Sequence, residues 1–198
     1  MSELVLDVGR AEGGMADFFS VPAARLFKVP SYLTDNQAAL IEPLATPLHA
    51  VRLAGDLRNK AVAIFGAGTI GLLTLVAARH AGARRVVSTD VLVAKRRLVL
   101  ELGADAVVDA GEPGVANAVR EELGESGDVV FDCVAHEHTL SEAVRVAIKG
   151  GTVVVVGGAR APVLLDLPLV QEYQVRLQGS TTHLREDFDD AVMLLRQK

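Results

Sequence analysis

The sequence is poor in cysteine, in positive charge and in long apolar runs, and each shortage excludes a class of protein. Its 198 residues contain one cysteine, Cys133, so neither an intramolecular disulfide nor a four-cysteine zinc site can form within it. Lysine and arginine number 20 against 25 aspartate and glutamate residues, which argues against a nucleic-acid partner because such proteins carry a basic surface. No apolar run approaches the roughly 20 residues that span a bilayer, so no membrane partner is expected.

Several motifs that would indicate other chemistries are also missing. The first ten residues, MSELVLDVGR, lack the apolar core of a signal peptide. Neither a Gly-x-Ser-x-Gly elbow nor a Walker loop occurs, so hydrolase and nucleotide triphosphatase functions have no support. We therefore expect a soluble, cytoplasmic protein.

From Lys60 onward, short apolar runs alternate with helical patterns. The alternation predicts a parallel sheet covered on both faces by helices, which is the α/β, doubly wound Rossmann architecture. The runs that predict its strands are AVAIF, RRVVSTD, ADAVVDA, DVVFDCV, TVVVVGG and QVRLQGS.

The first 60 residues follow a different pattern. Residues 1–30 place short apolar stretches between glycine and proline, which predicts strands and turns rather than helices. Thr34 to Gln37 matches a capping box and predicts the start of a short helix that Pro43 interrupts. A second helix is predicted from about Leu44 to Ala54, ending at Gly55.

The strongest local motif is the glycine run from Gly66 to Gly71, GAGTIG, between a predicted strand and a predicted helix. In that setting a G-x-G-x-x-G run binds the pyrophosphate of a dinucleotide at the helix N-terminus. Asp90 ends the next strand 19 residues after Gly71, where the fingerprint places an acid for the adenosine ribose. A carboxylate there favours NAD over NADP, although Arg96 and Arg97 lie near enough in sequence to leave NADP open.

Other residue groups have simpler interpretations. The alternative for the glycine motif is a Rossmann-like turn that binds no nucleotide. Cys133 is expected to be a buried, inert thiol, and His136 with His138 to lie in a helix-capping loop rather than in a metal site. His49 is expected to pack or to form a hydrogen bond. The acidic residues of the last predicted helix are expected on its solvated face: Asp187, Asp189 and Asp190.

Six stretches in order resemble the zinc-dependent medium-chain alcohol and polyol dehydrogenases, especially the sorbitol, threonine and butanediol dehydrogenase branch. The residues that carry the resemblance are GGMADFFSVPAARLFKVP, ALIEPLATPLHAVR, VAIFGAGTIGLL, STDVLVAKRRLVLELGADAVVD, DVVFDCV, and GGTVVVVGG with LQGSTTHLREDFDDAV. The resemblance implies that residues 1–45 are the C-terminal part of a β-rich, GroES-like catalytic domain. Residues 46–198 would then be the NAD-binding Rossmann domain. One departure is Ala135, where the family usually has glycine.

The resemblance also implies which part of the family's machinery is missing. The family's early cysteine ligand, its His-Glu pair and its four-cysteine structural zinc lobe have no counterpart in the sequence. Glu42 is the one candidate left on the metal side, as a zinc ligand or as a partner of the zinc-bound water. Zinc is therefore expected in a full-length parent but not stably bound to this chain, which would be catalytically incomplete.

The remaining site residues are carried over from the family position by position. Thr46 matches a position near the nicotinamide, Lys95 a basic position that touches the adenosine ribose, and Val134 the adenine side. The chain would pass the nicotinamide and its carboxamide at Val156, Gly157, Gly158, Ser180, Thr181 and Thr182. The pyrophosphate loop would comprise Gly66, Gly68, Thr69, Ile70 and Gly71, with Asp90 as the ribose acid.

Together these observations predict the cofactor-binding portion of an NAD-dependent, zinc-type dehydrogenase acting on a secondary alcohol or polyol. The resemblance further implies a homodimer or homotetramer through the Rossmann domain. Two alternatives stay open: a zinc-independent quinone or enoyl reductase of the same superfamily, and a non-catalytic NAD-binding module.

Overall fold

The computed structural model describes residues 17, 18 and 20–196, and it divides into two compact units between Leu33 and Thr34. The described part of the first unit contains one short 3-10 helix, Ala23–Arg25, and no strand. The strands predicted within residues 1–30 are therefore not found there, because a strand needs a hydrogen-bonded partner that this described part does not offer. Residues 1–16 and 19 of that prediction lie outside the described residues.

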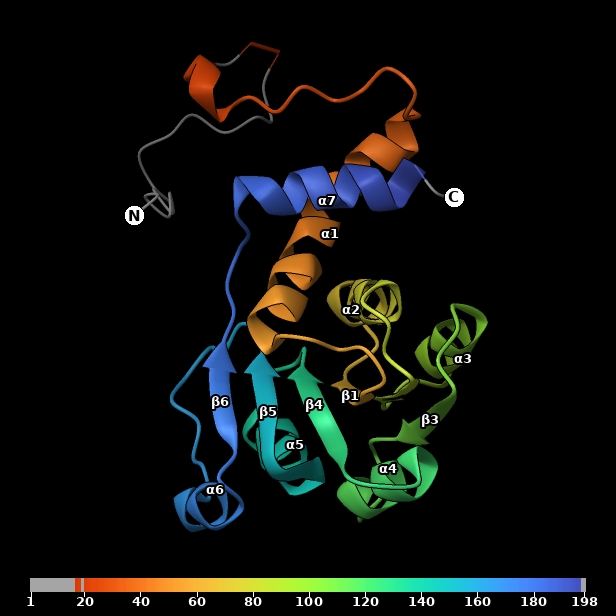
Figure 1. The fold of residues 1–198 in the computed structure, drawn as a ribbon, viewed down its shortest axis with the longest axis vertical. Coiled ribbons are helices and arrows are strands. Elements are labelled where there is room, and N and C mark those ends of the chain that lie inside the picture. The colour runs from red at the N-terminus through yellow and green to blue at the C-terminus, as the bar shows by residue number, and fades with distance from the viewer. Residues whose placement is uncertain (1–16, 19, 197–198) are drawn as a thin grey trace. The chain divides into compact units, whose positions relative to one another are not determined.

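The second unit is built on a six-stranded sheet in which every neighbouring pair of strands is parallel. The strand order is β3-β2-β1-β4-β5-β6, which confirms the predicted doubly wound fold. Figure 1 shows the sheet with helices on both sides. The strands are β1 (Ala61–Phe65), β2 (Arg85–Asp90), β3 (Ala106–Asp109), β4 (Gly127–Asp132), β5 (Ala147–Val155) and β6 (Arg176–Gly179).

Two groups of helices cover the two faces of this sheet (Figure 1). The helices α4 (Val115–Leu123), α5 (Glu137–Val146) and α6 (Leu167–Tyr173) pack on one face. The helices α1 (Asp35–Ala54), α2 (Thr69–His80), α3 (Val93–Glu101) and α7 (Arg185–Arg196) lie on the other. Among the described residues, no helix combines the length and the apolar character needed to cross a membrane.

The central strands are buried on both faces, which explains their near-continuous apolar sequences. All five residues of β1 are buried. Ala61, Ala63 and Phe65 belong to the apolar cluster under α4 and α5, so the alternate side chains of β1 point to the opposite face. Strand β6 forms one edge of the sheet, and the predicted oligomer through this domain stays a prediction.

Helix α1 is continuous from Asp35 to Ala54 with Pro43 and Pro47 inside it, so the predicted interruption at Pro43 is wrong. Proline removes one backbone hydrogen bond, but α1 packs against α2, α7 and β5 along its length, and this burial outweighs the local loss. The predicted capping box is confirmed, with Thr34 Oγ1 accepting from Gln37 N at 3.3 Å. The domain boundary predicted between residues 45 and 46 falls inside this helix, and the assignment of the two parts stays a prediction.

A polar cluster joins α1 to α7. Asp187 is fully buried, so its predicted place on the solvated face is wrong. Its carboxylate lies 3.0 Å from His49 Nδ1 and 2.9 Å from Arg52 Nη2, and it accepts a hydrogen bond from Leu184 N at 2.6 Å. His49 therefore lies against the Asp187 carboxylate at an ion-pair distance, whereas the alternative prediction of a hydrogen bond is not met at its Nδ1 atom. Asp190 is exposed as expected, and it pairs with Arg52 at 2.7 Å.

Candidate functional site

The strand order reverses between β1 and β4, which lie side by side, and an open parallel sheet is expected to form a ligand crevice at such a point. Strand β1 leads into α2 on one face of the sheet, whereas β4 leads into α5 on the other. The two connections diverge at this point, and open parallel sheets bind their ligands in the gap that such a divergence leaves. The glycine motif follows β1, so the topology places it at this crevice.

The glycine motif forms a tight turn between β1 and α2. Gly66 has φ +92°, a conformation that side-chain-bearing residues rarely adopt. A Cβ atom on Gly71 would lie 1.8 Å from the carbonyl oxygen of Gly66, so only glycine lets the first turn of α2 approach β1 this closely. These two glycines therefore shape the loop.

Gly68 differs from both because it leaves open space. It precedes α2 with an ordinary φ of −72° and provides no side-chain cap for the helix. A Cβ atom added to Gly68 would meet no other atom within 4 Å. The unfilled space lies where the first backbone N–H groups of α2, including Thr69 and Ile70, would face an anion. The loop therefore fits a dinucleotide pyrophosphate.

Asp90 lies at the end of β2 and is bonded to the glycine loop. Its Oδ2 atom accepts a hydrogen bond from Ala67 N at 2.9 Å, and its Oδ1 atom accepts one from Leu92 N at 2.9 Å. Lys95 Nζ lies 3.9 Å from Asp90 Oδ2. The structure thus brings the predicted ribose acid, its basic neighbour and the predicted phosphate loop together.

The two arginines that left NADP open differ in their surroundings. Arg96 Nη1 donates to the carbonyl oxygens of Asp90 and Val91 at 2.8 and 2.9 Å, and Arg96 Nη2 lies 2.6 Å from Asp109 Oδ2. These contacts hold Arg96 in a structural role between β2 and β3. Arg97 is exposed on α3.

Asp132 is a site residue that the sequence reasoning missed. It ends β4, is fully buried, and accepts hydrogen bonds from Val134 N and Ala135 N at 3.0 Å each. Thr139 Oγ1 donates to its second oxygen at 3.1 Å. Burial raises the pKa of Asp132, against the effect of these hydrogen bonds. An acid at the end of a buried strand, as at Asp90, is the sequence signal that could have revealed it.

We call the hydrogen bonds of Asp132 the Asp132 clamp. They fix the turn after β4 against the end of the neighbouring strand β5. Ala135 has φ +59°, the left-handed conformation that suits the glycine usual in the family. The carbonyl oxygen of Asp132 accepts from Val156 N and Gly157 N at 2.8 and 2.9 Å. A Cβ atom on Gly157 would lie 2.5 Å from the carbonyl carbon of Val134, so the two segments are in direct contact.

The other predicted residues lie after β5 and β6 at the same edge of the sheet. A Cβ atom added to Gly158 would meet no other atom within 4 Å. Ser180 N donates to Val155 O at 2.9 Å, which ties the segment after β6 to β5. Thr181 is exposed and Thr182 has φ +53°. Because strands of a parallel sheet end at one edge, these residues and the glycine loop share that edge.

Glu42 and Thr46 lie on helix α1 rather than at the end of a strand. They are four positions apart and so share one face of the helix, with Glu42 exposed and Thr46 half-buried. Among the described residues, no group of three or more His, Cys, Asp or Glu side chains could hold a metal ion. The described part of the chain therefore does not fit a complete zinc site, and the roles given to Glu42 and Thr46 stay predictions.

The two histidines after β4 act as a helix cap. His136 is the N-cap residue of α5: its side chain accepts from His138 N at 3.3 Å, and its own backbone N–H donates to Thr139 Oγ1 at 3.1 Å. Both histidines are exposed. The predicted capping role of this segment is confirmed.

Cys133 lies between the Asp132 clamp and the apolar core, and we expect its thiol to be unreactive in the folded protein. The residue is half-buried overall, but its Sγ atom lies 3.6 Å from Thr74 Oγ1, and burial raises its pKa to about 12. Only the thiolate reacts with disulfide reagents. At pH 8, an aromatic disulfide reagent should therefore label Cys133 at least about 100-fold more slowly than it labels the urea-unfolded chain.

The same pKa shift gives the free energy of unfolding a pH dependence. An exposed thiol titrates near about 8.5, so above that pH the unfolded chain loses its proton while folded Cys133 keeps it. Stability contributed by the raised pKa is therefore complete below about pH 8.5 and is lost as the pH rises toward 12.

Rapid labelling of the folded chain at pH 8 would contradict the expectation that the Cys133 thiol is unreactive. A Cys133→Ser variant controls for reaction at other residues.

A family model described as zinc-binding dehydrogenase matches residues 69–197. The chain is 34% identical over 149 residues to sorbitol dehydrogenase of Ovis aries, covering 74% of this chain and 42% of that protein. It is 28% identical over 192 residues to D-xylulose reductase of Saccharomyces cerevisiae, covering 94% of this chain and 54% of that protein. The chain thus spans about half the length of these curated relatives.

Solved structures show the same fold. A zinc-binding dehydrogenase from Sinorhizobium meliloti, bound to NADP, superposes with a TM-score of 0.82 at 34% identity, covering 89% of this chain and 53% of that one. The 2R,3R-butanediol dehydrogenase of Bacillus subtilis superposes with a TM-score of 0.80 at 27% identity, covering 86% of this chain and 49% of that one.

Proposed function

Since the chain belongs to the zinc-binding dehydrogenase family, we propose that it is the cofactor-binding portion of an NAD-dependent dehydrogenase of secondary alcohols or polyols. One observation carries the proposal: at the start of α2, the glycine loop is hydrogen-bonded to the carboxylate of Asp90 and leaves open space at Gly68. Sorbitol dehydrogenase and D-xylulose reductase among the relatives support the alcohol or polyol class.

Each part of the crevice has a role in this proposal. The N-terminal N–H groups of α2 bind the pyrophosphate, and Asp90 accepts hydrogen bonds from the adenosine ribose with Lys95 beside it. Val134 packs on the adenine side. The segments after β5 and β6 position the nicotinamide from Val156 to Gly158 and from Ser180 to Thr182, with Thr46 near the ring.

When bound, NAD supplies the carbon that accepts a hydride from the alcohol. The part of this chain lies in binding and orientation, which set the distance between the two reacting carbons. A catalytic zinc ion needs three protein ligands, and the described residues contain no group of three metal-ligating side chains. A zinc ion would therefore need ligands from outside the described part of the chain.

The cofactor preference follows from charge. The carboxylate of Asp90 is nearly buried at the end of β2, and a 2′-phosphate beside it would be repelled. Arg96 is already engaged by Asp109 and by two carbonyl oxygens, so it does not offset that repulsion. We therefore propose that NAD is preferred over NADP.

Titration of the 198-residue chain with NADH and with NADPH tests both parts of the proposal. The chain lacks tryptophan, so nicotinamide emission can be followed without tryptophan fluorescence. We expect saturable binding with NADH preferred. Asp90→Asn should weaken NADH binding by about 10–100-fold, because a charged acceptor of ribose hydroxyls is lost, and should reduce the preference over NADPH.

A matched control removes the same charge nearby without touching the loop. Glu101 is exposed at the end of α3, so Glu101→Gln should leave both affinities unchanged. Equal or tighter binding of NADPH by the parent chain would overturn the preference for NAD. Binding of neither cofactor would overturn the proposed function itself.

A further inference from the structure

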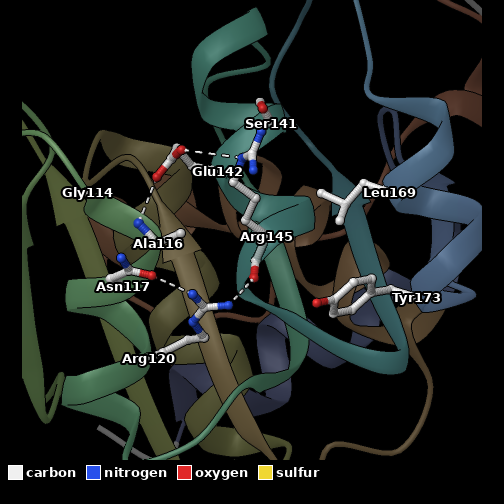
Figure 2. A pocket seen from close by; sticks show the side chains of 9 residues that line it. All are labelled: Gly114, Ala116, Asn117, Arg120, Ser141, Glu142, Arg145, Leu169 and Tyr173. Atoms are coloured by element: carbon white, nitrogen blue, oxygen red, sulfur yellow. Dashed lines mark hydrogen bonds and ion pairs between the residues drawn. The ribbon is translucent and has the colours of Figure 1, made fainter.

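A second candidate site lies on the face of the sheet covered by α4, α5 and α6. Residues in and beside these helices line an open pocket of about 520 Å³, which Figure 2 shows from close by. None of its lining residues belongs to the glycine loop, is Asp90, or lies within residues 133–135, 156–158 or 180–182. We name it the α4–α6 pocket; the polar residues that line it are Asn117, Arg120, Ser141, Glu142, Arg145 and Tyr173.

The pocket contains more positive than negative charge. Its lining contains two guanidinium groups, those of Arg120 and Arg145, and one carboxylate, that of Glu142. Arg120 donates to Arg145 O at 3.0 Å and to Asn117 Oδ1, both neutral acceptors, and within residues 20–196 no ion pair involves it. Arg145 is only loosely paired, because its nitrogens lie 3.9 Å from Glu142 and from Asp166.

The pocket also contains more hydrogen-bond donors than acceptors. The carboxylate of Glu142 already accepts from Ala116 N at 2.7 Å, and the amide oxygen of Asn117 accepts from Arg120. The NH₂ group of Asn117 and the hydroxyl groups of Ser141 and Tyr173 can still donate. Figure 2 shows the Tyr173 ring reaching from α6 into the pocket.

An excess of donors and of positive charge fits a ligand rich in oxygen acceptors and negatively charged. Guanidinium groups pair with phosphate or carboxylate, and neutral donors can bind further oxygen atoms of the same ligand. We propose that the α4–α6 pocket binds a small anion through its phosphate or carboxylate group, which Arg120 and Arg145 recognise. This binding does not rest on the proposed dinucleotide function.

NMR titration of the ¹⁵N-labelled full chain locates the binding. The probes are inorganic phosphate and citrate, each added at constant ionic strength with sodium chloride as the balancing salt. NADH is present at saturation, so that the glycine loop is blocked if it binds that cofactor. We expect saturable shifts at the amides of Asn117 and Ser141 and at the Arg120 side chain, with a dissociation constant of about 1 mM for at least one probe.

Variants of the chain separate a built pocket from general charge attraction. Arg120→Gln and Arg145→Gln should each weaken binding by about tenfold or more, because a charge-assisted hydrogen bond is lost. Tyr173→Phe removes one hydroxyl without changing charge and should weaken binding by a few fold. Lys149→Gln removes an exposed positive charge at the start of β5 and should change nothing.

The outcomes divide clearly. Saturable binding of phosphate, of citrate or of both at this pocket supports the proposal. Phosphate alone favours a phosphate group in the ligand, and citrate alone favours a carboxylate group. Shifts confined to residues 66–71 would overturn the proposal, as would equal weakening by Lys149→Gln and the two arginine variants. No shift with either probe would also overturn it, whether or not NADH binds.

Discussion

Gly71→Ala should lower the free energy of unfolding by about 3 kcal/mol, because overpacking against rigid backbone forces the surrounding elements apart. A Cβ atom on Gly71 would lie 1.8 Å from Gly66 O and 2.9 Å from Gly66 C. Both atoms are backbone, so the whole of α2 must move away from β1. The gain in helix propensity from alanine, about 1 kcal/mol, does not offset this clash. Urea unfolding followed by far-UV circular dichroism measures the loss.

Gly68→Ala is the matched comparison three residues earlier. A Cβ atom there would meet nothing within 4 Å, and φ is −72°, so stability should change by less than about 1 kcal/mol. Its methyl group would occupy the space proposed for the pyrophosphate, so NADH binding should weaken at least about tenfold. Equal stability of the two variants would contradict the close approach at Gly71. Unchanged NADH affinity in Gly68→Ala would contradict the role given to that space.

Asp187→Ala should destabilise the second unit by about 3 kcal/mol, since breaking a buried charged pair leaves its partners unpaired. The carboxylate of Asp187 is fully buried and is the meeting point of His49, Arg52 and Leu184 N. Its removal leaves α7 attached to α1 through apolar contacts, two ion pairs of Arg52 with exposed carboxylates and the hydrogen bond from Gln37 to Leu195 O. Thermal and urea unfolding measure the loss, and hydrogen exchange should show faster exchange in α7.

The control for this cluster lies two residues further along the same helix. Asp189 is exposed, so Asp189→Ala should change the free energy of unfolding by no more than about 0.5 kcal/mol. If both variants lost the same stability, the cause would be helix propensity or net charge rather than the buried contacts. If neither lost stability, the cluster would contribute nothing to the docking of α7.

The sheet could be predicted because each strand is recognisable from its own few residues. AVAIF is apolar throughout because β1 is buried on both faces, and each strand is followed by a helix of ordinary length. The prediction for helix α1 fails because Pro43 is a local signal, whereas α1 packs against α7, more than 130 residues further along the chain. Packing between distant elements decides whether a helix continues through a proline, and no short stretch of sequence shows that packing.

The candidate site, too, could be predicted in part from local sequence and in part not. The spacing of the glycines and of Asp90 pointed to one crevice, and the structure brings those residues together. The hydrogen bond from Ala67 N to Asp90 has no signature in spacing, because it joins residues 23 apart. Asp187 has the sequence context of an exposed helix residue, and only its position under α1 buries it. Tertiary contacts of single carboxylates therefore account for most of what the sequence could not predict.

The contacts between α1 and α7 also determine how the second unit can be joined to another polypeptide. Gln37 Nε2 donates to Leu195 O at 3.4 Å, so the first turn of the unit lies beside its last. A unit whose entry and exit points adjoin can be inserted into a surface loop of a host domain without stretching that loop. The same geometry would allow a short linker to close the unit into a circular permutant. The second unit thus has the geometry of an insertable module.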